Sequence, residues 1–377
     1  MLIARTIYYL ISFSLSTSLL WPTRSLANDN TIRIATFNLW DVQAKDLQSG
    51  SDPRLKKAAA MIQSVQPDII LLNEIAYDQN NNGQRFADGF LAKSQGINLK
   101  PISYRSLATP SNTGVHSGFD FDNNGKIVSD PYINPREYGN DAWGFGEFPG
   151  HYALAVLVRK DLKILESQVR SFQKFLWKDL PGAMKPVDPK TGKSWYNAEE
   201  WLQFRLSSKT HLDVPVQLGD DTILHVLASH PTPPVFDGEE DRNGARNHDE
   251  IRFWAEYING QRFITDDAGR RGGLPENAAF VILGDLNADP NDGDSIGNPM
   301  KRWLLSHPRI LDYKPKLARY HDRTRFGYAD DDDDTASWAL RVDYVLPSDN
   351  FLVNQGAVEW DASVSDHGLV WLEITVK

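Results

Sequence analysis

The chain has no cysteine among its 377 residues. This absence excludes disulfide bonds, a thiolate nucleophile, a cysteine-ligated zinc site and a lipid anchor attached to cysteine. The His-Glu-x-x-His pattern of zinc proteases is missing as well. Thiol chemistry and zinc proteolysis of this type are therefore removed from the functions to be considered.

Basic residues are scarce relative to acidic ones. With 40 Lys and Arg against 50 Asp and Glu, the formal net charge is −10 at pH 7. It becomes −12 when residues 1–27 are removed, because this segment holds Arg5 and Arg24 and no acidic residue. Non-specific binding of a nucleic-acid backbone depends on basic residues that neutralise phosphates, so the composition argues against such binding.

Long apolar runs are absent after residue 27. Before that point, Arg5 precedes an apolar run and residues 25–27 (Ser-Leu-Ala) offer small side chains for cleavage, which is typical of a secretory signal peptide. Serine and threonine interrupt the run, which is shorter than the ~20 apolar residues of a membrane span. We expect a signal peptide over 1–27, a mature domain over 28–377, no membrane span, and a secreted or periplasmic bacterial protein.

Hydrophobic periodicity predicts many strands and few helices. No low-complexity linker or internal repeat divides the chain, so we expect one large domain built on packed sheets. Helical patterns occur at 52–66, with Ser51 or Asp52 as the N-cap, and at 83–95 and 247–263. Apolar segments of strand type occur at 31–40, 67–75, 152–160, 161–169, 204–218, 222–230, 278–286, 340–347 and 368–376.

Acid, amide and imidazole side chains stand where several of these predicted strands end. A single Asn or Asp at a strand end is ordinary turn chemistry, and a lone histidine is usually a surface or satisfied core residue. Their repetition on five separate segments indicates one shared site. The residues are Asn38, Glu74, His230, Asp285, Asn287, Asp366 and His367.

In this order and context the chain resembles the endonuclease/exonuclease/phosphatase superfamily, which includes deoxyribonuclease I and, among others, secreted bacterial proteins. The matching blocks are "TFNLW", "PDIILLNEI", "SHP", "LGDLNADP", "RVDYVL" and "SDHGLVWL", spread over the whole mature chain. The resemblance implies an α/β (α+β) fold, a four-layered α/β sandwich in which two mixed β-sheets lie face to face and are flanked by helices. It also implies an active site at the loop ends of both sheets.

The resemblance implies a divalent-metal site. Glu74 corresponds to the principal metal carboxylate, Asn38 to its supporting amide, and Asp366 to a second acidic ligand. Such hard oxygen ligands suit Mg²⁺, Mn²⁺ or Ca²⁺, which keep open positions for water and phosphate oxygens. The number of ions stays open.

Catalytic roles follow from the same resemblance. Asp285 would orient or deprotonate the attacking water, and Asn287, on the same side of an extended backbone, would donate to a phosphate oxygen. His230 would contact the phosphate and help to protonate the leaving group. Asp343 would pair with His367, fix its tautomer and raise its basicity, so that a positively charged imidazole binds the scissile phosphate.

Two departures from the family pattern stand out. Asn73 occupies the place where many relatives have Gln, and we expect little effect because this side chain should face away from the site. Trp40 stands where some nucleases have an acid. Asp41 is adjacent, but on regular β geometry it would point elsewhere, so acidic support for a second ion is not expected from this loop.

Two further segments each allow two interpretations. Asp120, Asp122 and Asn124 match the opening of a calcium-binding loop, but the closing Glu of an EF-hand is missing, so a structural Ca²⁺ site and a plain Asx-rich turn both stay open. Arg242 and Arg246 lie in a charged segment after His230. They would reach an anionic part of the substrate, or belong to a solvated loop with Asn247 capping the helix that follows.

We therefore expect a secreted metal-dependent phosphoesterase that hydrolyses phosphomonoesters or phosphodiesters by in-line attack of water. Its substrates would be phosphorylated small molecules, phosphodiesters or nucleic acid, with no obligate protein partner. The first alternative is a secreted non-specific endonuclease, and the second is a non-catalytic binding module on the same fold. A sphingomyelinase is less favoured because the sequence shows no apolar hairpin for membrane entry.

Overall fold

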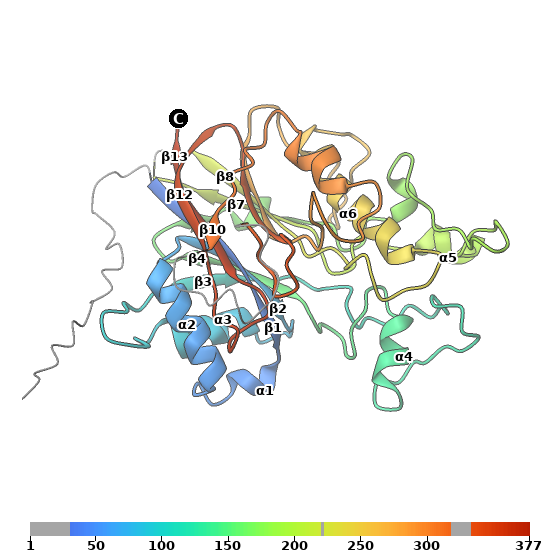
Figure 1. The fold of residues 1–377 in the computed structure, drawn as a ribbon, viewed down its shortest axis with the longest axis horizontal. Helices are drawn as coiled ribbons and strands as arrows, with labels where there is room; N and C mark the ends of the chain where they lie inside the picture. The colour runs from blue at the N-terminus through green and yellow to red at the C-terminus, as the bar shows by residue number, and fades with distance from the viewer. Residues whose placement is uncertain (1–30, 220–221, 318–332) are drawn as a thin grey trace, which may run out of the picture.

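Two β-sheets stacked face to face form the centre of the molecule (Figure 1). The computed structural model describes residues 31–219, 222–317 and 333–377. The predicted signal peptide lies outside these residues. Within the described helices, none combines the length and the apolar character needed to cross a membrane.

The first sheet has the strand order β10-β12-β13-β1-β2-β4-β3. β1 pairs with β2 in parallel and with β13 in antiparallel orientation, so the sheet is mixed, as predicted. Its strands are β1 (Thr31–Val42), β2 (Ile69–Ile75), β3 (Tyr104–Leu107), β4 (Leu154–Arg159), β10 (Lys316–Leu317), β12 (Phe351–Glu359) and β13 (Leu369–Val376).

The second sheet has the order β11-β9-β8-β7-β5, with β6 beside β7. β8 and β9 are parallel, whereas β9 and β11 are antiparallel, so this sheet is mixed as well. Its strands are β5 (Lys163–Ile164), β6 (Arg170–Ser171), β7 (Leu212–Gln217), β8 (Ile223–Ala228), β9 (Ala279–Asp285) and β11 (Asp343–Pro347).

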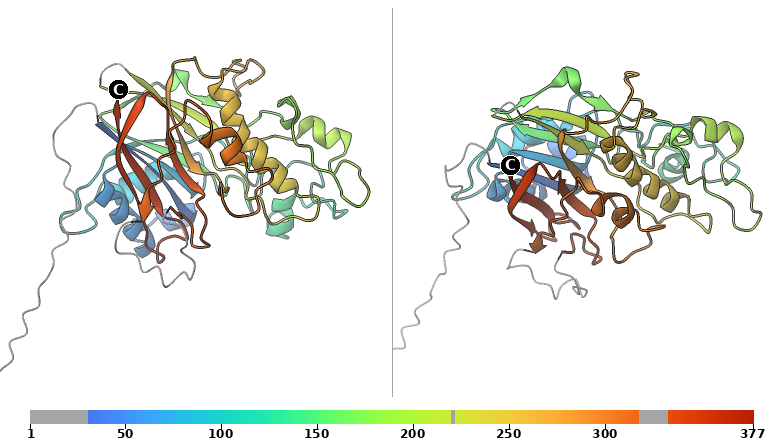
Figure 2. Two further views of the ribbon diagram at one scale, coloured as in Figure 1. Left: turned by 45° about the horizontal axis from the view of Figure 1, so that its top comes forward. Right: turned by 90° about the horizontal axis from the view of Figure 1, so that it is seen from above.

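Three apolar layers hold the sheets and helices together. The middle layer lies between the sheets, because alternate residues such as Ile34 on β1 and Val281 on β9 point inward and are fully buried. On the outer face of the first sheet pack α1 (Ala44–Leu47), α2 (Pro53–Val65), α3 (Asn82–Phe86) and the π-helical turn η1 (Ala87–Leu91). Over the second sheet pack α6 (Arg242–Ile258) and the π-helical turn η4 (Met300–Leu305) (Figure 2). The predicted four-layered sandwich is therefore confirmed.

The remaining short helices lie in the excursions between strands. They are α4 (Pro135–Asn140), α5 (Ala198–Gln203) and the 3₁₀ turns η2 (Glu166–Gln168) and η3 (Trp177–Asp179). Of these, α4 and α5 lie in the part of the molecule farthest from the C-terminus in Figure 1.

The predicted and observed element boundaries agree at strongly periodic segments and differ where the structure forms loops. Asp52 caps α2 as predicted, because its Oδ1 accepts a hydrogen bond of 2.9 Å from the Leu55 amide. The strands predicted over 161–169 and 204–218 shrink to β5 and β7. In 204–211 the main chain forms scattered bonds to residues 172–177, such as Leu206 N to Phe175 O (2.9 Å), in place of a continuous ladder. Other main-chain groups bond to side chains of α6, including Arg246 on Leu206 O and Glu250 on Ser208 N.

The helix predicted to start after Asn247 starts six residues earlier, at Arg242. Asp241 is the N-cap of α6, with a left-handed backbone (φ 48°) and no side-chain cap bond. Asn247 lies inside the helix. Its Nδ2 donates to Thr232 O (2.8 Å) and Leu286 O (3.0 Å), so this side chain ties two site loops to α6 instead of capping it.

Candidate active site

The inward-facing side of both sheets ends in polar residues. On β1, Asn38 continues the alternation of Ile32 and Ile34, which face the other sheet. By the same count, Asp285 continues the inward row of β9, and Asp343 begins that of β11. Beyond the end of β8, His230 follows its inward row. The predicted strand-end residues therefore converge where the apolar layer between the sheets stops.

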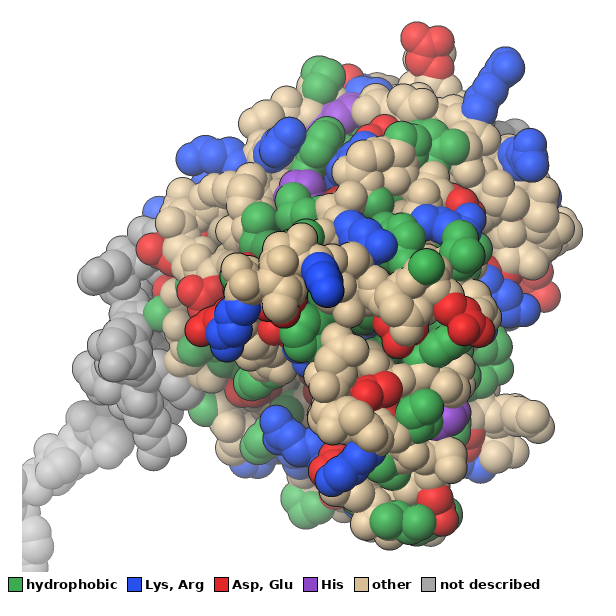
Figure 3. Space-filling model, turned by 90° about the vertical axis from the view of Figure 1, so that its right-hand side faces the viewer, with side chains coloured by type: hydrophobic (Ala, Val, Ile, Leu, Met, Phe, Trp, Pro, Cys, Tyr) green, Lys and Arg blue, Asp and Glu red, His purple; other side chains and the backbone are tan. Residues whose placement is uncertain are grey.

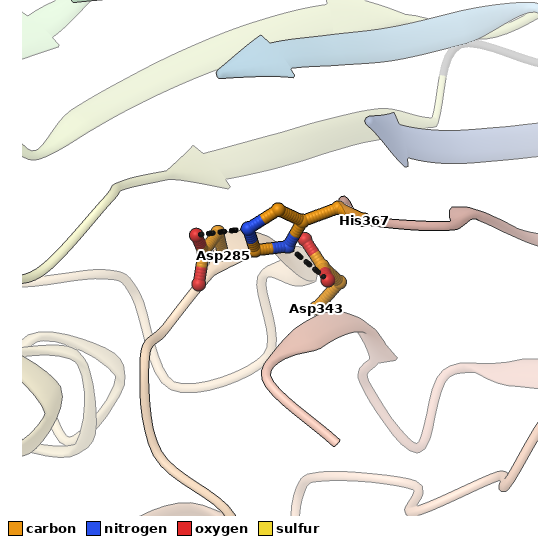
Figure 4. A group of neighbouring side chains, drawn as sticks. All are labelled: Asp285, Asp343 and His367. Carbon is orange, nitrogen blue, oxygen red and sulfur yellow. Dashed lines mark hydrogen bonds and ion pairs between the residues drawn. The ribbon is translucent and has the colours of Figure 1, made fainter. Parts of the chain in front are cut away.

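Asp285, Asp343 and His367 form the centre of this cluster (Figure 4). Asp343 and Asp285 are register partners on the antiparallel pair β9 and β11. His367, just before β13, places its ring between them, with Nδ1 2.8 Å from Asp343 Oδ2 and Nε2 3.6 Å from Asp285 Oδ2. The predicted pairing of Asp343 with His367 is present in the structure.

The charges of this group follow from burial and from one another. Burial alone would lower the pKa of His367, but the carboxylates of Asp343 and Asp285 raise it to about 10. Burial raises the pKa of Asp285 to about 6, and the His367 cation opposes that rise. At neutral pH His367 is therefore an imidazolium, and Asp285 is largely a carboxylate.

Asn38 links this group to Glu74. Its Nδ2 donates to Glu74 Oε1 (3.1 Å) and to Asp285 Oδ2 (3.0 Å), while its Oδ1 accepts from the Trp40 amide (3.0 Å). Asn38 thus supports the Glu74 carboxylate through its amide nitrogen.

Glu74, one residue before the end of β2, has an unusual backbone. Its φ is +58°, in the left-handed region, which interrupts the alternation of the strand at this residue. Its Oε2 accepts from the Asp41 amide (3.0 Å), and burial raises the pKa of the carboxyl group.

The expectation that Asn73 faces away is wrong, because it follows the inward row of Ile69 and Leu71 on β2. Its Oδ1 accepts from the Thr36 hydroxyl (3.3 Å) and its Nδ2 donates to Ser229 O (3.4 Å), so it lies between the two sheets.

The donor set fits a hard divalent cation. Each oxygen of Glu74 accepts one hydrogen bond and keeps lone pairs, and Asp366 Oδ1 is buried with no hydrogen-bond partner among the described residues. Both residues line the same cavity. Asp285, Asp343 and His367 also offer ligand atoms within 4.8 Å of one another, but a protonated His367 has no lone pair to give to a metal.

The expectation that Asp41 points away from the site is wrong. The register of β1 on β2 shifts between Asn38 and Val42, and Trp40 and Asp41 have φ of 54° and 51°. Because the backbone is not regular β structure here, Asp41 lines the cavity beside Glu74. Its Oδ1 lies 2.9 Å from Nε2 of the buried His151.

His151 holds the Asp41 carboxylate in a defined direction. Its ring stacks between Phe148 and Tyr152, with centroid distances of 4.3 and 3.6 Å. Nδ1 accepts from the Glu147 amide (3.1 Å), so the proton of the neutral ring sits on Nε2 and is donated to Asp41. The site thus gains an oriented carboxylate that the sequence did not reveal.

His230 and Asn287 flank Asp285. His230 Nε2 lies 3.4 Å from Asp285 Oδ2, and its buried Nδ1 has no partner among the described residues. Burial, together with the nearby cations of Lys209 and His367, holds the pKa of His230 well below its usual range. His230 is therefore a neutral imidazole, in contrast to His367.

The argument that placed Asn287 on an extended backbone is wrong. β9 ends at Asp285, and Asn287 has φ of 52°, with its amide donating to Asp285 Oδ1 (3.0 Å). Its Nδ2 donates to Pro231 O (3.1 Å). Asn287 nevertheless lines the cavity, so its predicted contact with phosphate stays a prediction.

These residues lie in a cavity of about 790 Å³. Arg242 and Arg246 line it too. Arg246 is buried, and its guanidinium donates to main-chain carbonyls, including Leu206 O (2.8 Å) and Trp143 O (2.6 Å), so it fixes the cavity wall. Arg242 pairs with Glu240. A direct contact of either arginine with substrate stays a prediction.

Lys209 is a further cavity residue that the sequence did not point out. It lies in the segment predicted as a strand over 204–218, and its side chain is buried against the site. Nothing in its spacing or neighbours in the sequence distinguishes it from the other lysines.

Ser295 also lines the cavity, within a Gly-x-Ser-x-Gly match at residues 293–297. A nucleophile elbow of that pattern needs a sharp turn from strand to helix. This serine instead lies in a loop ten residues after the end of β9, so the match does not carry the structure of a serine hydrolase site.

The candidate calcium loop gathers three carboxylates away from this centre. Asp120, Asp122 and the buried Asp141 offer oxygens within 4.8 Å of one another. Burial raises the pKa of Asp141 to about 6, and the charges of the other two carboxylates add to the effect. Asn124 instead directs its Nδ2 at Asp122 Oδ2 (3.1 Å), as in an Asx-rich turn. Both interpretations of this loop stay open.

The sequence matches the family model described as "Endonuclease/Exonuclease/phosphatase family" over residues 35–367. The chain belongs to this family. Every activity in the family's name hydrolyses a phosphoric ester, so the chain is a phosphoric ester hydrolase. No curated protein matches the sequence.

Two solved structures share this fold. The endonuclease/exonuclease/phosphatase from Beutenbergia cavernae DSM 12333 is 16% identical, with a TM-score of 0.52 over 92% of this chain and 72% of that chain. The human Nocturnin catalytic domain, solved with a bound sulfate anion, is 12% identical, with a TM-score of 0.50 over 93% and 95% of the two chains. At these identities the likeness shows the shared fold alone.

The buried pair of His367 and Asp343 predicts how stability depends on pH. The folded-state pKa of about 10 lies above the ordinary value of 6.5, so the stabilisation is complete below about pH 6.5 and is lost as pH rises through about 10. We expect His367→Gln to lower the free energy of unfolding most at about pH 6 and least at about pH 10, measured by urea unfolding.

His307→Gln provides the control. Burial lowers the pKa of His307, so that side chain is neutral in both states above about pH 7 and its replacement should have a constant effect from there to about pH 10. An effect of His367→Gln that is equally independent of pH would contradict the proposed charge of His367.

Proposed function

We propose that the chain is a secreted, metal-dependent phosphoesterase that hydrolyses phosphodiesters or phosphomonoesters of small molecules by in-line attack of water. One observation carries the proposal. Asp285, Asp343 and His367 meet Asn38 and Glu74 at the end of the layer between the sheets, on a cavity large enough for more than a phosphate group.

Glu74 and Asp366, assisted by Asn38, are the residues that would hold the divalent ion, Mg²⁺ or alternatively Mn²⁺ or Ca²⁺. When bound, the ion supplies charge neutralisation for the phosphate. Asp41 adds a further oriented carboxylate beside Glu74.

The side chains of the centre have complementary charge states. Asp285, with a pKa of about 6, is ionised at neutral pH and accepts the proton of the attacking water. His367 stays protonated through its contact with Asp343 and binds a phosphate oxygen as a cation. His230 is neutral and donates one N–H to the substrate.

The proposed substrates are small because the surface does not suit a polynucleotide. The net charge is −10, and on the face shown in Figure 3 the Lys and Arg side chains are interspersed with acidic and hydrophobic ones and form no continuous stripe. The secreted non-specific endonuclease remains the second candidate, since divalent ions can screen an acidic surface.

Export is proposed from the N-terminal residues 1–27 alone. A protein recovered outside the cytoplasm that begins near Asn28 in N-terminal sequencing would support it. A protein that keeps Met1 or stays in the cytoplasm would contradict it.

Loss of the central carboxylate tests the proposed function. We expect Glu74→Ala to lower kcat/KM by at least about 10³-fold, because the metal would lose its principal ligand. The assay is hydrolysis of a panel of plasmid DNA, RNA, a bis-phosphodiester dye, sphingomyelin and sugar phosphates. A chelator should abolish the activity, and Mg²⁺, Mn²⁺ or Ca²⁺ should restore it.

Arg242→Ala is the matched control for that experiment. Arg242 lines the same cavity and pairs with Glu240, which is not a proposed metal ligand, so Arg242→Ala should change the preference among larger substrates and leave hydrolysis of the small dye intact. If Glu74→Ala keeps full activity on every substrate that is cleaved, the site assignment is wrong. If the wild-type chain cleaves none of them, the non-catalytic binding module gains support.

We also propose a structural Ca²⁺ ion at Asp120, Asp122 and Asp141. The three converging carboxylates repel one another, and a bound cation would relieve that repulsion and stabilise the folded state. Millimolar Ca²⁺ should raise the Tm of the wild-type protein in a thermal melt. Asp141→Asn should remove this gain, whereas Asp130→Asn, an exposed acid of the same loop, should keep it. Equal gains in both variants would favour the Asx-rich turn.

A further inference from the structure

Lys209 is held rigidly in the wall of the active-site cavity. Its side chain is 6% exposed and lines the cavity. Its carbonyl accepts from the Asn112 amide (2.9 Å). The neighbouring residue Ser208 is fixed by Glu250 of α6, whose Oε1 accepts from the Ser208 amide (2.6 Å) and hydroxyl (2.9 Å). The Oε2 of Glu250 accepts from the Thr232 amide (2.7 Å). The buried Glu250 thus joins the segment before Lys209 to the loop after His230.

The ammonium group itself is poorly satisfied. It donates one hydrogen bond, to Pro231 O (3.2 Å), and within the described parts of the chain it forms no ion pair. An ammonium has three donors, and a buried cation without a counter-ion is costly. Burial accordingly lowers the pKa of Lys209, although the carboxylates of Glu250, Asp285 and Glu74 act in the opposite direction from a distance.

The position of this ammonium is defined by its single bond. Pro231 O also accepts from Asn287 Nδ2 (3.1 Å), so the Lys209 ammonium and the Asn287 amide bond to the same carbonyl oxygen. That carbonyl belongs to the residue after His230. Two free N–H donors of Lys209 are therefore available where His230, Asn287 and Asp285 border the cavity.

We propose that Lys209 is a catalytic residue whose ammonium donates to a non-bridging oxygen of the substrate phosphoryl group. The charge-assisted bond supplies the counter-ion that the buried lysine lacks, and it neutralises charge on the side of the phosphate that faces His230. This inference rests on the proposed phosphoesterase function. The alternative is that Lys209 has a purely structural role and only ties its segment to Pro231.

The test compares Lys209→Met and Lys209→Arg with the wild-type protein. Inorganic phosphate is titrated calorimetrically into the chelator-treated protein, so that anion binding is measured without metal or turnover. In parallel, kcat and KM on the dye phosphodiester are measured with saturating Mg²⁺, and Tm is measured by a thermal melt. Lys57→Met is the matched control, because Lys57 is exposed on α2 and bonds only to the Ser363 hydroxyl (2.8 Å).

We expect Lys209→Met to weaken phosphate binding roughly 10- to 100-fold and to lower kcat/KM by at least that factor, as befits a lost bond between two charged groups. Its Tm should be unchanged or higher, since an apolar side chain of similar length replaces an uncompensated buried cation. Lys209→Arg should recover part of the phosphate binding, and Lys57→Met should behave as wild type in all three measurements.

Two results would overturn the proposal. One is a phosphate Kd of Lys209→Met that matches the wild type, or no phosphate binding by the wild-type protein at all. The other is a lower Tm with kcat/KM unchanged, which marks a structural lysine. Failure of the proposed function can be told apart from failure of this inference. If the proposed function is wrong, the wild-type protein shows no turnover, and the phosphate titration still measures the contribution of Lys209 to anion binding.

Discussion

The site depends on one buried ion pair, between His367 and Asp343. The two residues come from different sheets, and their contact of 2.8 Å joins the segment before β13 to the start of β11. Burial alone would lower the pKa of His367, and the carboxylate of Asp343, together with that of Asp285, opposes this effect. The site therefore contains a permanent cation beside Asp285 at physiological pH, and a phosphate dianion or diester anion finds a positive partner before any metal is considered.

Burial at the end of an apolar layer shifts the pKa of four other groups in the site. Desolvation raises the pKa of the acids Glu74 and Asp285, and it lowers that of the bases His230 and Lys209. The same physical effect therefore produces a base that titrates near neutrality and a neutral imidazole next to a cationic one. Two histidines in one cavity can then have different roles, because only His367 has a carboxylate in hydrogen-bonding contact on its Nδ1 side.

The sequence predicted the fold class and the convergence of the strand-end residues, since alternation on a regular strand determines which side chains face the other sheet. It failed where the backbone departs from regular geometry. Asp41 reaches the cavity because positive φ angles interrupt β1, and Lys209 reaches it because side chains of α6 pin a loop that looked like a strand. Such positions depend on tertiary contacts that no local pattern encodes.

The pH dependence of kcat/KM on a small dye phosphodiester tests most directly whether Asp285 and His367 act in opposite charge states. In the proposed active form, Asp285 has lost its proton and His367 has kept its proton. With pKa values of about 6 and about 10, kcat/KM should rise roughly tenfold per pH unit up to about 6, stay level, and fall above about 10. A profile with no rise through about pH 6, or one unchanged by Asp285→Asn, would contradict the assignment.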